Sequence, residues 1–81
     1  MLTKEIVDYF PDTNEVRIIL IEDTKPEKIE ELLRLGWQRP YKDCLIKKWS
    51  KEAIDEAVKY FPNSLTQQVI DKYQRENVCE R

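Results

Sequence analysis

The chain has 81 residues and a formal charge of −2, with 41% hydrophobic and 37% charged residues, which is typical of one small folded domain with an economical core. It has no histidine, one glycine and two cysteines. The commonest general base, a glycine-rich phosphate loop and a cysteine–histidine metal site are therefore missing from the sequence. We expect a protein that is not an enzyme and that uses no metal and no cofactor.

The longest apolar run, residues 16–21, is interrupted by Arg17 and is far shorter than the roughly 20 residues that span a bilayer. No apolar region follows a basic start in the first residues, as it would in a secretory signal. We therefore expect no membrane association and a cytoplasmic location. Cys44 and Cys79 are expected to be reduced thiols, because a disulfide between them would need an oxidising compartment.

The first predicted element is a β-hairpin. Residues 3–10 alternate only loosely, with Ile6, Asp8 and Phe10 on one side of an extended chain and Val7 and Tyr9 on the other. They predict a strand, with a short helix over residues 2–10 as the alternative. Residues 11–14, Pro-Asp-Thr-Asn, are typical of a turn. Residues 16–22 are rich in β-branched side chains and predict the central strand of a sheet.

A helix is predicted next. Thr24 is placed as its N-cap, Glu27 would complete a capping box, and Pro26 is tolerated in the first turn. Gly36 suits the left-handed position that ends a helix, and Trp37 can then fold back onto the last turn. The predicted apolar stripe of this helix comprises Ile29, Leu32 and Leu33.

Residues 37–39, a turn over 40–43 and a strand over 44–49 follow, and they predict a second hairpin or a strand preceded by an extended arm. Ser50 is placed as the N-cap of a helix that Pro62 ends, with an inner face of Ala53, Ile54, Ala57, Val58 and Phe61. Asn63 or Ser64 would cap a last helix, with an inner face of Leu65, Val69, Ile70 and Tyr73. Residues 76–81 are expected to fray.

The order β-β-α-β(β)-α-α predicts a single α+β domain over residues 1–81. Its architecture would be a small antiparallel sheet of three to four strands with helices packed on one face.

The most unusual stretch is the basic-aromatic segment, residues 34–51. Its six basic and one acidic side chains give it a formal charge of +5, whereas the rest of the chain sums to −7. Basic and aromatic side chains together are typical of surfaces that bind nucleic acids or acidic partners. The candidate partner-binding residues are Arg39, Tyr41, Lys42, Lys47, Lys48 and Lys51. The alternative is structural: the two tryptophans pack inside, and Lys47 and Lys48 keep an edge strand from aggregating.

The sequence offers two other candidate surfaces. The last two helices resemble a helix-turn-helix in length, with Thr66, Gln67, Gln68, Asp71, Lys72 and Arg75 as base-reading candidates; against this, residues 52–81 have a net charge of −2. An acidic cluster around the first helix could imitate phosphates, although the helix dipole alone would favour acids there; its members are Glu22, Asp23, Glu27, Glu30 and Glu31.

The sequence thus predicts a non-catalytic binding protein, a small accessory, inhibitor or regulatory protein of a size that suits mobile genetic elements or phages. Its partner would be a protein or nucleoprotein that contacts the basic-aromatic segment. One alternative is direct binding of nucleic acid by the same segment. Another is a structural homo-oligomer, such as a homodimer, that pairs through an edge strand or the last helix.

Overall fold

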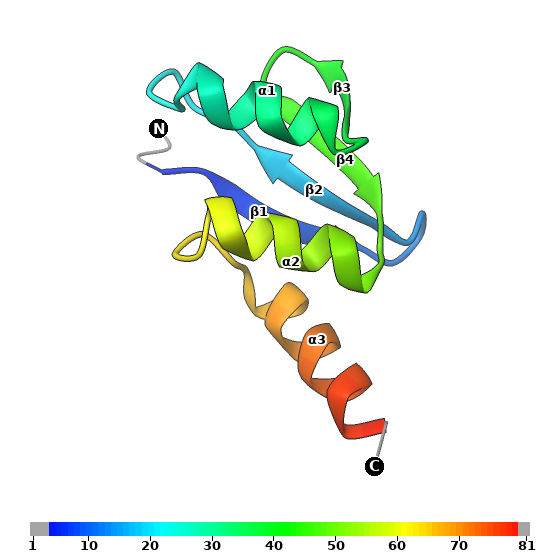
Figure 1. Ribbon diagram of the computed structural model, residues 1–81. Helices are drawn as coiled ribbons and strands as arrows, with labels where there is room; N and C mark the ends of the chain where they lie inside the picture. The colour runs from blue at the N-terminus through cyan, green and yellow to red at the C-terminus, as the bar shows by residue number, and fades with distance from the viewer. Residues whose placement is uncertain (1–3, 80–81) are drawn as a thin grey trace.

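The computed structural model describes the backbone of residues 4–79 and the side chains of residues 4–76. Four strands and three helices occur in this part of the chain, in the predicted order (Figure 1). Their bounds are β1 Ile6–Phe10, β2 Glu15–Ile19, α1 Pro26–Arg34, β3 Gln38–Tyr41, β4 Cys44–Lys48, α2 Lys51–Tyr60 and α3 Gln67–Cys79.

The strands form one antiparallel sheet in the order β1-β2-β4-β3. The hairpin prediction for the N-terminal half is confirmed: residues 6–10 are a strand, and β2 is central in the sheet, although it is shorter than the predicted 16–22. Helices α1 and α2 lie on the same face of the sheet, and α3 extends away from its β1 side (Figure 1). This is the α+β architecture that the sequence predicts.

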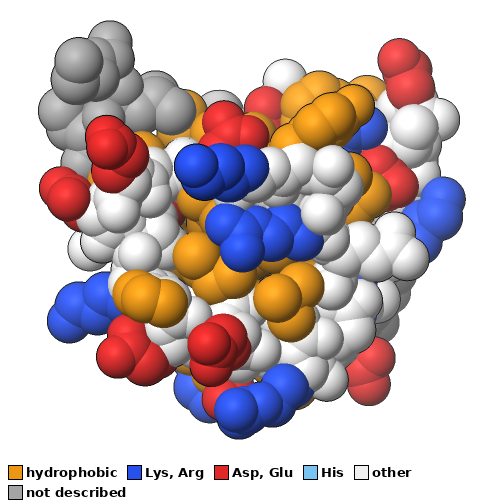
Figure 2. All heavy atoms as spheres, turned by 90° about the horizontal axis from the view of Figure 1, so that it is seen from above, with side chains coloured by type: hydrophobic (Ala, Val, Ile, Leu, Met, Phe, Trp, Pro, Cys, Tyr) orange, Lys and Arg blue, Asp and Glu red, His pale blue; other side chains and the backbone are white. Residues whose placement is uncertain are grey.

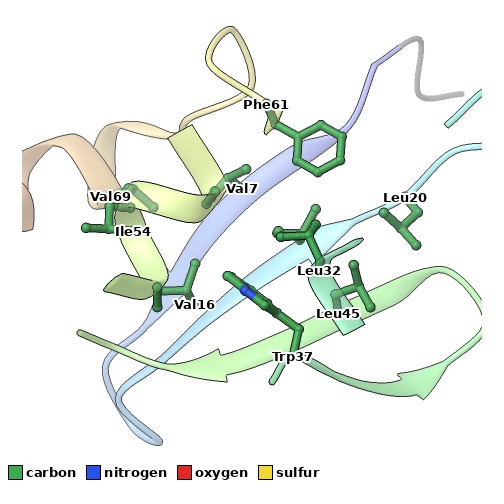
Figure 3. Packing of buried hydrophobic residues seen from close by; sticks show 12 residues of the cluster. Val7, Val16, Leu20, Leu32, Trp37, Leu45, Ile54, Phe61 and Val69 are labelled. Carbon is green, nitrogen blue, oxygen red and sulfur yellow. The ribbon is translucent and has the colours of Figure 1, made fainter. Parts of the chain in front are cut away.

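The hydrophobic core lies between the sheet and the two helices that cover it. Side chains alternate along a strand, so Val7, Val16, Ile18 and Leu45 point to the helices and are fully buried. Figure 3 shows Val7, Val16 and Leu45 among side chains from the helical layer. The other core members are Leu20, Leu32, Trp37, Ala53, Ile54, Ala57, Phe61 and Val69. Burial of each large aliphatic side chain stabilises the fold by about 1.5–3 kcal/mol.

The end of α1 is built as the sequence predicts. Gly36 has a φ of 102°, and its N–H donates to the carbonyl of Leu33 over 3.2 Å, while the N–H of Trp37 donates to that of Leu32 over 3.1 Å. This pair of hydrogen bonds defines a Schellman motif. Trp37 is 3% exposed and folds back into the core, so the cap also fixes where the chain re-enters the sheet.

The predicted capping box at the start of α1 is wrong. The N-cap is Lys25, with no side-chain hydrogen bond. The hydroxyl of Thr24 instead donates to Glu5 Oε2 over 2.6 Å and accepts from the N–H of Ile21 over 3.0 Å. Thr24 is buried, and a buried hydroxyl needs hydrogen-bond partners. These two contacts supply them.

The two last helices begin differently. Ser50 caps α2 as predicted, with Oγ accepting from the N–H of Ala53 over 3.0 Å. The prediction that Asn63 or Ser64 caps the last helix is wrong, because α3 begins only at Gln67. The carbonyl of Ser64 accepts from the N–H of Val7, the carbonyl of Val7 accepts from the N–H of Thr66, and Leu65 forms a parallel bridge beside β1.

Helix α3 continues to Cys79. The sequence predicts fraying from residue 76, but the backbone of residues 76–79 is helical. Residues 80–81 lie outside the described residues. Three predicted inner positions are exposed rather than buried: Leu33 of α1 and Val58 of α2, each 38% exposed, and Tyr73 of α3, 39% exposed.

Candidate partner-binding surface

The β3–β4 hairpin forms one edge of the sheet. All four side chains of β3 are exposed. Gln38 pairs with Ile46 and Tyr41 with Cys44, so β3 carries one extra residue between these pairs, as in a β-bulge. Pro40 lies in this stretch and offers no N–H. A bulged edge with a proline resists the addition of another strand, so contacts made here would come from side chains.

Internal hydrogen bonds fix the turn of this hairpin. Arg39 donates from Nε and Nη2 to the carbonyl of Lys42, over 3.0 and 2.6 Å. The carbonyl of Asp43 accepts from the N–H of Leu20 over 2.7 Å. Tyr41 is 71% exposed, more than any other large hydrophobic side chain in the described part of the chain. The structure thus brings together Arg39, Tyr41 and Lys42 on a turn of defined shape.

Lys47 has a structural environment. Its side chain points to the helical side of the sheet and is 21% exposed. The ammonium donates to Glu56 Oε1 over 3.0 Å and to the carbonyl of Leu35 over 2.8 Å. Glu56 Oε1 also accepts from the indole N–H of Trp37 over 2.8 Å. Lys47 therefore joins β4 to the end of α1 and to α2.

The other two predicted residues lie apart from the hairpin turn. Lys48 is at the opposite end of β4, where its ammonium donates to the carbonyl of Thr13 over 2.9 Å. Lys51 begins α2 and pairs with Asp55 over 3.4 Å. Of the six candidates, three gather at the hairpin turn, and the other three bind different parts of the fold.

A shallow groove adjoins the turn, between the hairpin and α1. Its apolar wall includes Pro26, Ile29 and Leu33, which follow one face of the helix. The full lining consists of Leu20, Ile21, Glu22, Asp23, Thr24, Pro26, Ile29, Glu30, Leu33, Arg39, Lys42 and Asp43. Figure 2, which looks onto this end of the molecule, shows Lys and Arg side chains over hydrophobic ones, with acidic side chains around them.

The groove brings the predicted acidic cluster and the basic-aromatic segment to one place. Acidic Glu22, Asp23 and Glu30 line it from the α1 side, and Arg39 and Lys42 line it from the hairpin side. None of these five side chains forms an ion pair with another side chain of residues 4–76. Their charges are therefore free to meet a partner.

The sheet face opposite the helices has no described helix packed on it. The pairing register sets its side chains in three rows across the strands: Ile6, Ile19, Cys44 and Tyr41; Asp8, Arg17, Ile46 and Gln38; and Phe10, Glu15 and Lys48. Arg17 stacks on the Phe10 ring, 4.1 Å from its centroid, and donates to Glu15 Oε1 over 3.2 Å. Side chains at the centre of this face therefore contact one another. The buried Arg17 Nε has no hydrogen-bond partner within the described chain.

The contacts of α3 do not resemble a helix-turn-helix. Six residues separate α2 from α3, and Leu65 within them bridges to β1. The ammonium of Lys72 lies over the rings of both Tyr9 and Trp49, 4.9 and 5.0 Å from their centroids. A candidate base-reading residue is thereby engaged inside the molecule.

A hydrogen-bonded ion pair completes this attachment. Glu76 accepts from the Trp49 indole over 2.9 Å and pairs with Lys72 over 3.0 Å. Two hydrogen bonds lower the pKa of Glu76: the larger effect comes from the Trp49 indole and the next from the Lys72 ammonium. The hydrogen bond to Glu76 raises the pKa of Lys72. Both charges help to hold α3 against the sheet.

The described residues hold no group of three or more His, Cys, Asp or Glu side chains arranged to bind a metal ion. Cys44 is a free, buried thiol, and its burial raises its pKa, so it is a poor nucleophile near neutral pH. The side chain of Cys79 lies outside the described residues. Among the helices described, none is both long and apolar enough to cross a membrane.

The apolar wall of the groove is the feature that sequence reasoning missed. The sequence predicts Ile29 and Leu33 as part of the inner stripe of the helix and Pro26 as a residue of its first turn. Ile29 does pack against the core, and it also lines the groove with Pro26 and Leu33. The spacing 26, 29, 33 does place them on one face, a signal that the apolar stripe of α1 is wider than the core requires. Comparison of the chain with family models, with curated proteins and with solved structures finds no match.

Proposed function

We propose that this protein is a non-catalytic binding protein, a small accessory, inhibitor or regulatory protein that occupies a surface of a protein or nucleoprotein partner. Its contact surface is the turn of the β3–β4 hairpin, with Arg39, Tyr41 and Lys42 as the principal contacts. Lys47, Lys48 and Lys51 are not principal contacts in this proposal. The ammonium groups of Lys47 and Lys48 bind other parts of the fold, and Lys51 lies away from the turn, at the start of α2.

The exposure of Tyr41 is the observation that carries the proposal. An aromatic side chain that is 71% exposed leaves most of its apolar surface in water, and aromatic and arginine side chains are the usual anchors of protein interfaces. Arg39 is held by two hydrogen bonds to the turn, so little side-chain entropy is lost when it binds. These features favour a preorganised contact.

Direct binding of nucleic acid is the second candidate, favoured by the same exposed tyrosine between two cations. The charges of the groove weigh against it. Four acidic side chains line the groove beside Arg39 and Lys42: Glu22, Asp23, Glu30 and Asp43. A polyanion along this surface would meet more negative than positive charge. A mobility shift at two salt concentrations tests this alternative, since phosphate contacts weaken steeply with salt.

Affinity capture from the native host tests the proposal. The bait is the full chain in three forms: wild type, a hairpin variant carrying Arg39→Glu, Tyr41→Ala and Lys42→Glu, and a control variant carrying Lys59→Glu, Tyr73→Ala and Arg75→Glu. The control makes the same change in charge and removes one exposed tyrosine, but on α2 and α3.

The proposal predicts a partner that the wild type and the control retain and the hairpin variant loses. Far-UV circular dichroism should be the same for all three proteins. Retention of every captured partner by the hairpin variant would contradict the proposal.

A further inference from the structure

We propose that the groove between α1 and the β3–β4 hairpin holds a short amphipathic helix of a partner protein, oriented by opposite charges on the two sides of the groove. The inference rests on the proposed function, since it assigns a partner class to the same surface. It goes further by specifying the shape, apolar spacing and charge pattern of the bound segment.

The apolar wall has the geometry of a helix-packing face. Pro26, Ile29 and Leu33 stand at spacings of three and four residues on α1, while Leu32 on the neighbouring face points into the core. Pro26 and Leu33 are exposed, and Ile29 packs against the core but is only half-buried, so the fold leaves apolar surface of this row in contact with solvent. Pro26 to Leu33 spans about 10 Å, or two helical turns. A partner helix with apolar residues at i, i+3 or i+4, and i+7 matches that length.

The opposite wall would confine such a helix. Arg39 and Lys42 line the groove from the hairpin, and the hydrogen bond from Leu20 N–H to the Asp43 carbonyl ties the hairpin turn to the end of β2. The buried hydroxyl of Thr24 bonds to Glu5 and to the N–H of Ile21, which fixes the loop that forms the other end. The groove is therefore preformed on both sides, which lowers the entropy lost on binding.

The charges select both the class of partner and its orientation. Glu22, Asp23 and Glu30 lie on the α1 side and would attract Lys or Arg of the bound helix. On the hairpin side, Arg39 and Lys42 outnumber Asp43 and would attract Asp or Glu. A helix with a basic flank and an acidic flank satisfies both walls. Nucleic acid carries charge of one sign and cannot do so.

Selection of helical peptides tests the inference. A phage-displayed library of random peptides of about 16 residues, long enough for a groove-binding helix, is selected on the immobilised full chain. Selected sequences should show the apolar spacing given above, with acidic residues on one flank and basic residues on the other. Selected peptides without that pattern, or no selected peptide at all, would overturn the inference.

Matched substitutions then locate the binding. Leu33→Asp should weaken binding of a synthesised, selected peptide by about tenfold or more in fluorescence polarisation, as loss of a central apolar contact does. Val58→Asp, at a residue of equal exposure on α2, should leave the affinity unchanged. Arg39→Glu should also weaken binding, and a peptide with Lys in place of its hairpin-side acid should restore it. Equal effects of Leu33→Asp and Val58→Asp, or no restoration, would overturn the inference.

Three further results separate this inference from the proposed function. If the native partner is lost with the hairpin variant but kept with Leu33→Asp, the hairpin is the contact surface and the groove is not. If neither change affects the partner, both proposals fail. If light scattering finds a dimer of the chain that Leu33→Asp dissociates and Val58→Asp does not, the occupant is a second copy and the inference of a foreign helix is overturned.

Discussion

Lys47 gives the sharpest test of the division between structural and exposed basic residues. Lys47→Met keeps the aliphatic stem but removes hydrogen bonds to Glu56 Oε1 (3.0 Å) and the Leu35 carbonyl (2.8 Å). A hydrogen bond that involves a charged group contributes about 1.5–3 kcal/mol. The side chains of Lys47 and Glu56 are 21% and 19% exposed, and Glu56 keeps the indole bond from Trp37. We therefore expect the lower end, a loss of about 1–2 kcal/mol in the free energy of unfolding.

Lys47→Glu should cost more, because it sets two carboxylates side by side where a cation bridged the helices. Removal of one partner of a fully buried ion pair costs about 3–5 kcal/mol. Partial exposure lowers this cost for Lys47→Met, and the added repulsion in Lys47→Glu raises the expected loss to about 3 kcal/mol. A domain of this size has a total stability of about 4–12 kcal/mol. The reversal therefore removes a large share of it.

Urea denaturation followed by tryptophan fluorescence measures both losses of unfolding free energy. In thermal unfolding, each kcal/mol lost should lower the Tm by about 4–8 °C. Lys42→Glu is the control, since an exposed substitution changes stability by less than about 0.5 kcal/mol. Glu56→Gln, made in the wild type and in Lys47→Met, completes a double-mutant cycle. The expected coupling energy between the two side chains is about 1 kcal/mol or more. If Lys47→Met left the midpoint unchanged, or Lys47→Glu were as mild as Lys42→Glu, the structural role of Lys47 would be refuted.

Gly36→Ala should lower stability by about 1–2 kcal/mol in the same denaturation assay, because a φ of 102° strains any residue with a Cβ; an unchanged midpoint would argue against the Schellman cap. The pKa of Glu76 is lower in the folded than in the unfolded chain, so its stabilising effect is complete above the unfolded value of 4.5 and is lost as pH falls through the folded pKa. The indole N–H resonance of Trp49 should shift in that acidic range, and Glu76→Gln should remove the shift. In a Cys79→Ser background, Cys44 should react with Ellman's reagent only as fast as the protein opens, and prompt reaction in the native state would contradict its burial.

Local signals in the sequence predicted local structure well. The Schellman motif at Gly36 and Trp37 and the cap at Ser50 each depend on residues within a few positions, so spacing alone was sufficient. Because successive side chains of a strand point to opposite faces, the predicted strand over residues 44–49 is enough to place Lys47 and Lys48 on different faces. It could not show that the Lys47 side faces the helices, because that depends on Glu56 and Leu35 in other elements.

The errors came from competition with distant partners. Thr24 looked like an N-cap, but Glu5, far away in sequence, holds its hydroxyl in the core-side loop. Ser64 looked like the next cap, but the free backbone groups of Val7 at the edge of β1 bind residues 64–66 and delay the helix. Buried backbone groups must find partners, and one-dimensional patterns do not show which segments supply them.

The sequence predicts the hairpin residues of the candidate surface but not the groove, because the groove depends on contacts between distant segments. Arg39, Tyr41 and Lys42 were named from composition, and the structure places them on one turn. The groove beside them combines that turn with α1 and the end of β2. Only the pairing of β2 with β4 brings these elements together, so the groove could not be read from any single stretch of sequence.

The most direct test of the central claim is the dissociation constant of the purified, captured partner for the hairpin variant and for the control variant on α2 and α3. Loss of one arginine and one tyrosine anchor with a neighbouring cation should cost about 3 kcal/mol or more, which is at least about a hundredfold in affinity. The control should bind as the wild type does. Equal affinities for the hairpin variant and the wild type would contradict the claim that this turn is the partner-binding surface.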